Sequence, residues 1–128
     1  MSARFRLMPT ETTEAQVLDA VLRYLAIEPR VTWGPYRCNV GQIKAPRSPE
    51  AWAGWSITNA SRKPAVGFPD VICAVGGVLV CVEVKRASTG LSGAQRAFSE
   101  YCEKGGTLYA VVRSVDDAVE VIQRVERG

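Results

Sequence analysis

The chain has 128 residues, which is enough for one compact domain. Hydrophobic residues make up 47% and charged residues 23%, as in ordinary globular proteins, so the composition argues against a disordered chain. Histidine is absent, which excludes Ser–His–Asp and Cys–His relays, zinc bound by histidine, and any nuclease whose base is imidazole. Any chemistry must therefore be carried by carboxylates, lysine, tyrosine or cysteine.

The net charge of +3 is concentrated in one stretch of the chain. Residues 30–70 contain six basic and two acidic residues, and the rest of the chain is close to neutral. Twelve of the 16 basic residues are arginine, whose forked guanidinium suits phosphate. An excess this small fits either a solvated surface or a surface that binds nucleic acid.

The cysteines and the apolar segments indicate where in the cell the protein is located. Four cysteines occur without C-x-x-C spacing, so a zinc site is not expected: Cys38, Cys73, Cys81 and Cys102. No apolar stretch follows the charged N-terminus, so we expect no signal peptide. The longest apolar run, residues 71–82, is too short to span a bilayer and is divided by Gly76-Gly77. We therefore expect a cytoplasmic protein without membrane contact.

The first expected element is a helix that begins after Thr13. Thr13 and Gln16 have the spacing of a capping box, and Pro29 ends the segment. The apolar residues between them recur at helical spacing: Val17, Leu18, Val21, Leu22 and Leu25. Glu14 shares this core-facing stripe. It is either a functional carboxylate or an acid favoured by the helix dipole.

Residues 30–66 are interrupted by prolines and contain only short strand-like pieces. These pieces are Val31–Trp33, Tyr36–Val40 and Trp55–Asn59. We expect one or two strands here and a long basic loop.

A β-hairpin is the clearest element of the sequence. The β-branched runs Asp70–Val75 and Val78–Lys85 are separated by Gly76-Gly77, a two-residue turn signal. This turn pairs residue 75 with residue 78 and, counting outward, places Asp70 opposite Glu83. Alternation puts six residues on one face: Ile72, Ala74, Leu79, Cys81, Glu83 and Lys85. Cys73 points to the other face, so the hairpin holds no disulfide.

The last third of the chain predicts a helix, a strand and a second helix. Ser92 and Gln95 form another capping box, and Gly105-Gly106 ends this helix. Its expected apolar stripe is Ala94, Ala97, Phe98, Tyr101 and Cys102. Thr107–Val112 is an apolar strand, and Ser114 starts a final helix. The stripe of that helix is Val115, Ala118, Val119, Ile122 and Val125. The order indicates a mixed sheet covered by helices, in one domain over residues 1–128 with a loose segment at 1–10.

Asp70, Glu83 and Lys85 are the residues of this pattern that can carry chemistry. Two carboxylates opposite each other on paired strands repel, so a cation between them is expected. Mg²⁺ accepts hard oxygen ligands and retains waters, and Lys85 lies on the same face two residues beyond Glu83. Such a group suits metal-assisted hydrolysis of a phosphodiester. The alternative is an ion pair between Lys85 and both acids.

The wider sequence resembles the PD-(D/E)xK nuclease superfamily, and within it the VRR-NUC family. The strings that carry the resemblance occur in the family's order: GFPD (67–70), EVK (83–85), LSGAQ (91–95) and VRSVDD (112–117). Arg37-x-Asn39-x-Gly41 and Glu14 also look like family features, so the match covers residues 14–119. The resemblance implies an α/β fold of the α+β mixed-sheet kind: a restriction-endonuclease-like αβββαβ core with a C-terminal helix.

The resemblance also implies roles for individual residues. Asp70 and Glu83 would bind Mg²⁺ or Mn²⁺ with the backbone carbonyl of Val84, and Glu14 would be a further ligand or catalytic carboxylate. Lys85 would orient or activate the attacking water. Gln95 would point toward the same site, which is compatible with its capping role.

Five residues would contact DNA. Arg37 and Asn39 would lie near the scissile phosphate, although Arg37 could equally be an ordinary surface residue. The other three are expected to make non-specific phosphate contacts: Arg62, Lys63 and Arg86.

The function implied by the resemblance is a metal-dependent DNA endonuclease without a nucleotide cofactor. Stand-alone members of the family look like homodimers that act on branched DNA such as four-way (Holliday) junctions. Small lone domains of this kind are commonly encoded by phages, so the expected place is the cytoplasm of a bacterial or phage-infected cell. A nicking, flap-cutting or restriction-type nuclease and a non-catalytic nucleic-acid-binding module remain open alternatives.

Overall fold

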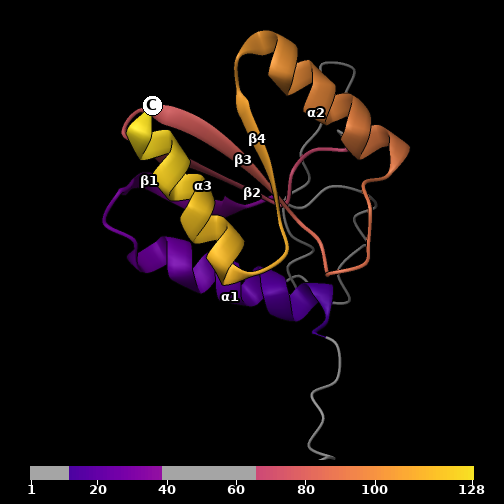
Figure 1. Cartoon of the computed structure of the whole chain (residues 1–128), viewed down its shortest axis with the longest axis horizontal. Helices are drawn as coiled ribbons and strands as arrows, with labels where there is room; N and C mark the ends of the chain where they lie inside the picture. The colour runs from indigo at the N-terminus through magenta and orange to yellow at the C-terminus, as the bar shows by residue number, and fades with distance from the viewer. Residues whose placement is uncertain (1–11, 39–65) are drawn as a thin grey trace, which may run out of the picture.

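A computed structural model describes residues 12–38 and 66–128 of the chain. Its helices and strands follow one another in a single order (Figure 1): α1 (Glu14–Ile27), β1 (Val31–Arg37), β2 (Val71–Val75), β3 (Val78–Val84), α2 (Gly93–Gly105), β4 (Leu108–Val112) and α3 (Val115–Arg127). This is an α+β protein with an αβββαβ core and a C-terminal helix, so the expected fold class is confirmed.

The strands form one mixed sheet in the order β1-β2-β3-β4. β1, β2 and β3 are antiparallel neighbours, whereas β4 runs parallel to β3. The expected hairpin register is confirmed from Val75 opposite Val78 to Val71 opposite Val82. Gly76 and Gly77 have φ of 56° and 86°, which a two-residue turn of this kind requires. Both strands are one residue shorter than expected, because residues 70 and 85 lie just beyond the ladder.

The two strand-like pieces at residues 31–33 and 36–40 contribute to one strand, β1, which ends at Arg37. Its pairing with β2 is irregular on both sides of Trp33. Gly34, in this irregular part, has φ of +81°, and a Cβ there would lie 3.0 Å from the carbonyl oxygen of Ile72. A side chain at this position would therefore be strained and crowded. The third expected piece, Trp55–Asn59, lies outside the described residues.

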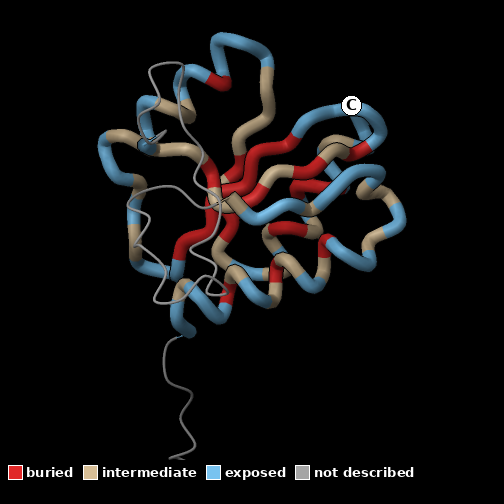
Figure 2. Tube along the Cα trace, turned by 180° about the vertical axis from the view of Figure 1, so that it is seen from behind, coloured by how far each residue is buried: buried red, intermediate tan, exposed pale blue. Residues whose placement is uncertain are grey.

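The hydrophobic core lies on the face of the sheet that α1 and α3 cover (Figure 1). The buried residues are at alternate positions of β2, as a half-buried strand requires. Figure 2 shows the buried segments concentrated in the strands and on the inner sides of the helices. The core consists of Val17, Val21, Leu25, Val71, Cys73, Val75, Val80, Val82, Val84, Ala110, Val112, Ala118, Val121 and Ile122. The stripe expected for the last helix omitted Val121.

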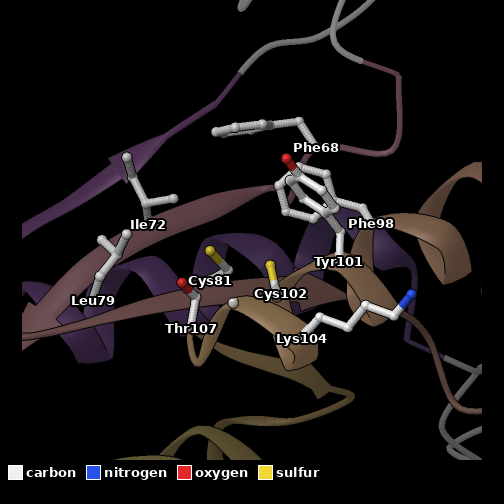
Figure 3. A pocket seen from close by; sticks show the side chains of 10 residues that line it. Phe68, Ile72, Leu79, Cys81, Phe98, Tyr101, Cys102, Lys104 and Thr107 are labelled. Atoms are coloured by element: carbon white, nitrogen blue, oxygen red, sulfur yellow. The ribbon is translucent and has the colours of Figure 1, made fainter.

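The stripe expected for α2 is only partly correct. Of the described α2 side chains, Cys102 is the buried hydrophobic one, whereas Tyr101 is 77% exposed. The helix packs against β4 and leaves an apolar cavity of about 520 Å³ beside the sheet. Figure 3 shows the rings of Phe68, Phe98 and Tyr101 gathered at one end of this cavity. An apolar stripe indicates which side of a helix faces the protein but not how closely it is covered.

Two further observations concern the cysteines and the helices. All four cysteines are free thiols, and Cys73 and Cys81 lie on opposite faces of the hairpin. In the described part of the chain, no helix has the length and apolar character to cross a bilayer.

Candidate metal centre

Asp70, Glu83 and Lys85 lie at the same end of the hairpin. Asp70 directly precedes β2, Glu83 is the penultimate residue of β3, and Lys85 directly follows that strand. Glu83 is 1% exposed and Lys85 is 7% exposed, so two ionisable side chains are buried close together. Proteins bury charged groups at a large cost in solvation free energy unless a partner compensates it, so this group requires an explanation beyond packing.

Asp70 is held in place by the strands on both sides of it. Its Oδ2 accepts a hydrogen bond from the backbone N–H of Val84 at 2.8 Å. Its backbone carbonyl accepts another from the N–H of Cys38 at 2.7 Å. The carboxylate of Asp70 therefore lies against the end of β3, close enough for its charge to raise the pKa of Glu83. The β2–β3 ladder ends at the pair Val71–Val82, so the expected pairing of Asp70 with Glu83 stays a prediction.

Glu83 has one satisfied and one unsatisfied carboxylate oxygen. Oε2 accepts a hydrogen bond from Nε2 of Gln95 at 2.9 Å, whereas Oε1 is buried without a partner among the described residues. Burial and then the neighbouring Asp70 carboxylate raise the pKa of Glu83 from 4.5 to about 8. A buried carboxylate in this state needs either a proton or a cation, because its free oxygen has no donor.

Gln95 performs two functions with one amide group. Its Oε1 accepts a hydrogen bond from the N–H of Ser92 at 2.9 Å, and the Ser92 hydroxyl accepts one from the N–H of Gln95 at 3.2 Å. This capping box fixes the side chain so that Nε2 points to Glu83. The expected compatibility of the capping role and a position beside Glu83 is confirmed.

Lys85 lies near the two acids without forming an ion pair with them. None of the ion pairs between described residues includes Lys85. Its positive charge nevertheless lowers the pKa of Glu83 against the larger effects that raise it, so the ammonium is within electrostatic reach of that carboxylate. The structure therefore lacks the ion pair that the alternative interpretation of these three residues required.

Glu14 is close enough to this group for its charge to affect Glu83. It is the first residue of α1, is half-buried, and contributes to the raised pKa of Glu83. Within residues 12–38 and 66–128, no three cysteine or acidic side chains converge as a ready metal cluster. The proposed ligand roles of Glu14 and of the Val84 carbonyl stay predictions.

The donors present nevertheless suit one kind of cation. Asp70 and Glu83 are hard oxygen donors, and Glu83 has a buried oxygen with no donor among the described residues. Mg²⁺ and Mn²⁺ bind to one or two carboxylates and fill their remaining positions with water. Two neighbouring carboxylates with an unsatisfied oxygen therefore fit such a cation better than they fit zinc, which prefers nitrogen and sulfur donors.

The residues expected to contact DNA are only partly described. Arg37, at the end of β1, is exposed and pairs with Val71, the residue that follows Asp70. Arg86 is exposed beside Lys85, and its Nε donates a hydrogen bond to the hydroxyl of Thr89 at 3.1 Å. Asn39, Arg62 and Lys63 lie outside the described residues. The DNA contacts of all five residues stay predictions.

No protein-family model matches this chain, and a search of curated proteins finds no relative. The resemblance to the VRR-NUC family therefore rests on the sequence motifs alone. The geometry described above is independent of that resemblance, because it follows from the positions of the side chains.

Gly67 is one residue at this site whose importance the sequence motifs did not reveal. It has φ of +88°, and a Cβ there would lie 2.3 Å from the carbonyl oxygen of Ala94 in the first turn of α2. Only glycine allows this close approach between the segment that carries Asp70 and the helix that carries Gln95. The GFPD string contains this glycine, but the contact with α2 joins segments that are distant in sequence, so the string alone does not indicate it.

Arg113 is another residue to which the sequence motifs gave no role, although VRSVDD contains it. Its Nη1 donates hydrogen bonds to the carbonyls of Arg86 and Thr89, each at 2.7 Å. Its own N–H donates to Oδ2 of Asp117 at 2.9 Å. Arg113 thus fastens the loop that follows Lys85 to the end of β4.

Proposed function

We propose that this chain is a divalent-metal-dependent endonuclease that hydrolyses phosphodiester bonds in DNA. The observation that carries the proposal is the buried and unsatisfied Oε1 of Glu83 beside Asp70. A fold gains nothing in stability from two acids placed together in this way, whereas a cation between them would remove the repulsion. The proposal is further supported by Lys85, a buried lysine with no ion pair to another described residue.

In this proposal Asp70 and Glu83 hold Mg²⁺ or Mn²⁺, with the Val84 carbonyl and Glu14 as further ligands. The bound metal supplies Lewis acidity, which draws charge from the scissile phosphate and acidifies the attacking water. Gln95 keeps the Glu83 carboxylate in one orientation through its hydrogen bond to Oε2. Lys85 orients the attacking water and stabilises negative charge that develops on the phosphate.

The substrate class and assembly rest on the family resemblance. We propose branched DNA such as four-way junctions as the substrate and a homodimer as the active form, in the cytoplasm of a bacterial or phage-infected cell. A two-fold dimer would offer two active sites and a longer basic surface than a single small domain. Arg37 and Arg86 are exposed near the site and are the described candidates for phosphate contacts.

Lys85→Ala tests the proposal in a cleavage panel of duplex, flap, single-stranded and four-way-junction DNA with Mg²⁺ or Mn²⁺. We expect wild-type cleavage to depend on the metal and the variant to lose about 10²–10⁴-fold in rate while it still binds DNA. Lys104→Ala is the matched control, because Lys104 is an exposed lysine in the last turn of α2.

Two outcomes would contradict the catalytic assignment. One is a Lys85→Ala variant that cuts as fast as the wild type. The other is a wild-type protein that binds DNA tightly and cleaves none of the four substrates with either metal, which would favour the non-catalytic binding module.

A further inference from the structure

Tyr109 lies on the same face of the sheet as the candidate metal centre. It pairs with Cys81 in the parallel β3–β4 ladder, two residues before the position opposite Glu83. Its ring packs beside that of Phe98 in α2, with centroids 6.0 Å apart. The tyrosine is therefore held between the sheet and α2, next to the strand that carries Glu83.

The hydroxyl of Tyr109 is buried and has no hydrogen-bond partner among the described residues. Burial raises its pKa, and the carboxylates of Glu83 and Asp70 raise it further, so the phenol stays protonated and lies within electrostatic reach of both acids. A buried hydroxyl without a partner costs about 1–3 kcal/mol of stability. Packing of the ring alone would be achieved equally well by phenylalanine.

The two unsatisfied buried side-chain atoms in the described part of the chain are complementary. One is the Tyr109 hydroxyl, a donor, and the other is Glu83 Oε1, an acceptor. A single ordered water between them would give the hydroxyl an acceptor and Oε1 one donor, and it would leave the second lone pair of Oε1 for a cation. Carboxylates that bind metals are commonly oriented by hydrogen bonds of this kind from residues that do not touch the metal.

We propose that Tyr109 is a positioning residue of the metal centre, whose hydroxyl donates a hydrogen bond through one water to Glu83 Oε1 and so orients that carboxylate for a divalent cation. This inference rests on the proposed metal site. It gives Tyr109 no contact with the DNA or with the reacting atoms.

Tyr109→Phe tests this role by Mn²⁺ binding, measured by titration calorimetry on the full chain without DNA. We expect the Mn²⁺ affinity to fall about 10-fold or more, as for other residues that orient a metal ligand. The metal-free melting temperature should fall by no more than a few degrees, because the substitution removes the water-mediated hydrogen bond to Glu83 but keeps the packing of the ring against Phe98. The affinity is therefore the deciding measurement: a residue with a purely structural role would leave it unchanged.

Tyr101→Phe is the matched control, since Tyr101 is 77% exposed on α2 and should bind Mn²⁺ as the wild type does. Wild-type affinity in Tyr109→Phe would overturn the inference and leave the metal site itself intact. A wild-type protein that does not bind Mn²⁺ would overturn the proposed function and this inference with it.

Discussion

The Glu83 carboxylate lies in an unfavourable electrostatic environment. It is 1% exposed, lies beside a second carboxylate, and has one oxygen without a donor among the described residues. The hydrogen bond from the Gln95 amide and the positive charge of Lys85 both stabilise the ionised form of Glu83. They do not offset the effects of burial and of Asp70, so Glu83 binds a proton in the metal-free protein.

The metal-free protein should lose stability as the pH rises from about 5 to about 8. Folding raises the pKa of Glu83 from 4.5 to about 8, so between these values the folded state binds more protons than the unfolded chain. The contribution is fully present below pH 4.5 and is lost as the pH rises through about 8. Melting curves at several pH values in a chelating buffer measure it.

Glu83→Gln is the control for this pH dependence, because an amide of the same shape does not titrate. Its melting temperature should stay nearly constant over the same pH range.

Asp70→Asn should raise the metal-free melting temperature near pH 8, because the substitution removes the negative charge beside Glu83 and keeps an acceptor for the Val84 N–H. A wild-type melting temperature that rises from pH 5 to pH 8 would contradict the assigned environment of Glu83.

At the scale of elements, the site is assembled where the start of β2, the end of β3 and the first turn of α2 meet. The contact between Gly67 and Ala94 sets how closely α2 approaches, because a Cβ on Gly67 would overlap the Ala94 carbonyl. The position of Gln95 beside Glu83 depends on this approach. A glycine outside the candidate ligand set therefore controls the geometry of the centre.

Gly67→Ala should lower the melting temperature by about 5–10 °C, from about 2 kcal/mol of backbone strain and displacement of α2. It should also weaken Mn²⁺ binding, because the displaced helix carries Gln95. Gly90→Ala is the matched control: a Cβ at Gly90 would meet no described atom within 4 Å, and the φ of this glycine lies outside the left-handed region. Equal melting temperatures for the two variants would show that the close approach at Gly67 is not required.

Local signals predicted most of the fold and part of the site. The two glycines at residues 76 and 77 fixed the hairpin register, and the Ser92–Gln95 spacing fixed the start of α2, because turns and caps depend on neighbouring residues. The roles of Tyr109 and Arg113 depend on strands and loops that are distant in sequence. The exposure of Tyr101 likewise depends on what covers α2, which no periodic pattern contains.

At the scale of the whole molecule, the described elements cover the two faces of the sheet unequally. α1 and α3 bury one face, whereas α2 covers the other only in part and leaves a cavity of about 520 Å³. Four large hydrophobic side chains near or on that second face are exposed: Trp33, Tyr36, Leu79 and Tyr101. Trp33 and Leu79 both pair with Ala74, and Tyr36 pairs with Ile72, so these three exposed side chains lie on the same face of the sheet.

The proposed homodimer should sediment as a species of about twice the chain mass of 13.9 kDa at micromolar concentration. Dilution should shift the population toward the monomer, because a dimer forms by mass action. Sedimentation velocity over a roughly 100-fold range of concentration, with and without Mg²⁺, measures this. A monomer at every concentration in both conditions would contradict the dimer.

The two hydrogen bonds of the Gln95 side chain restrict which residues can replace it. Ser92 requires an acceptor from this side chain, and Glu83 requires a donor from it. A glutamate would keep the cap but add a further negative charge beside Glu83, and an alanine would lose both contacts. Of these three side chains, only glutamine makes both hydrogen bonds at the same time. The start of α2 and the orientation of Glu83 therefore depend on one side chain, and losing it would destabilise both.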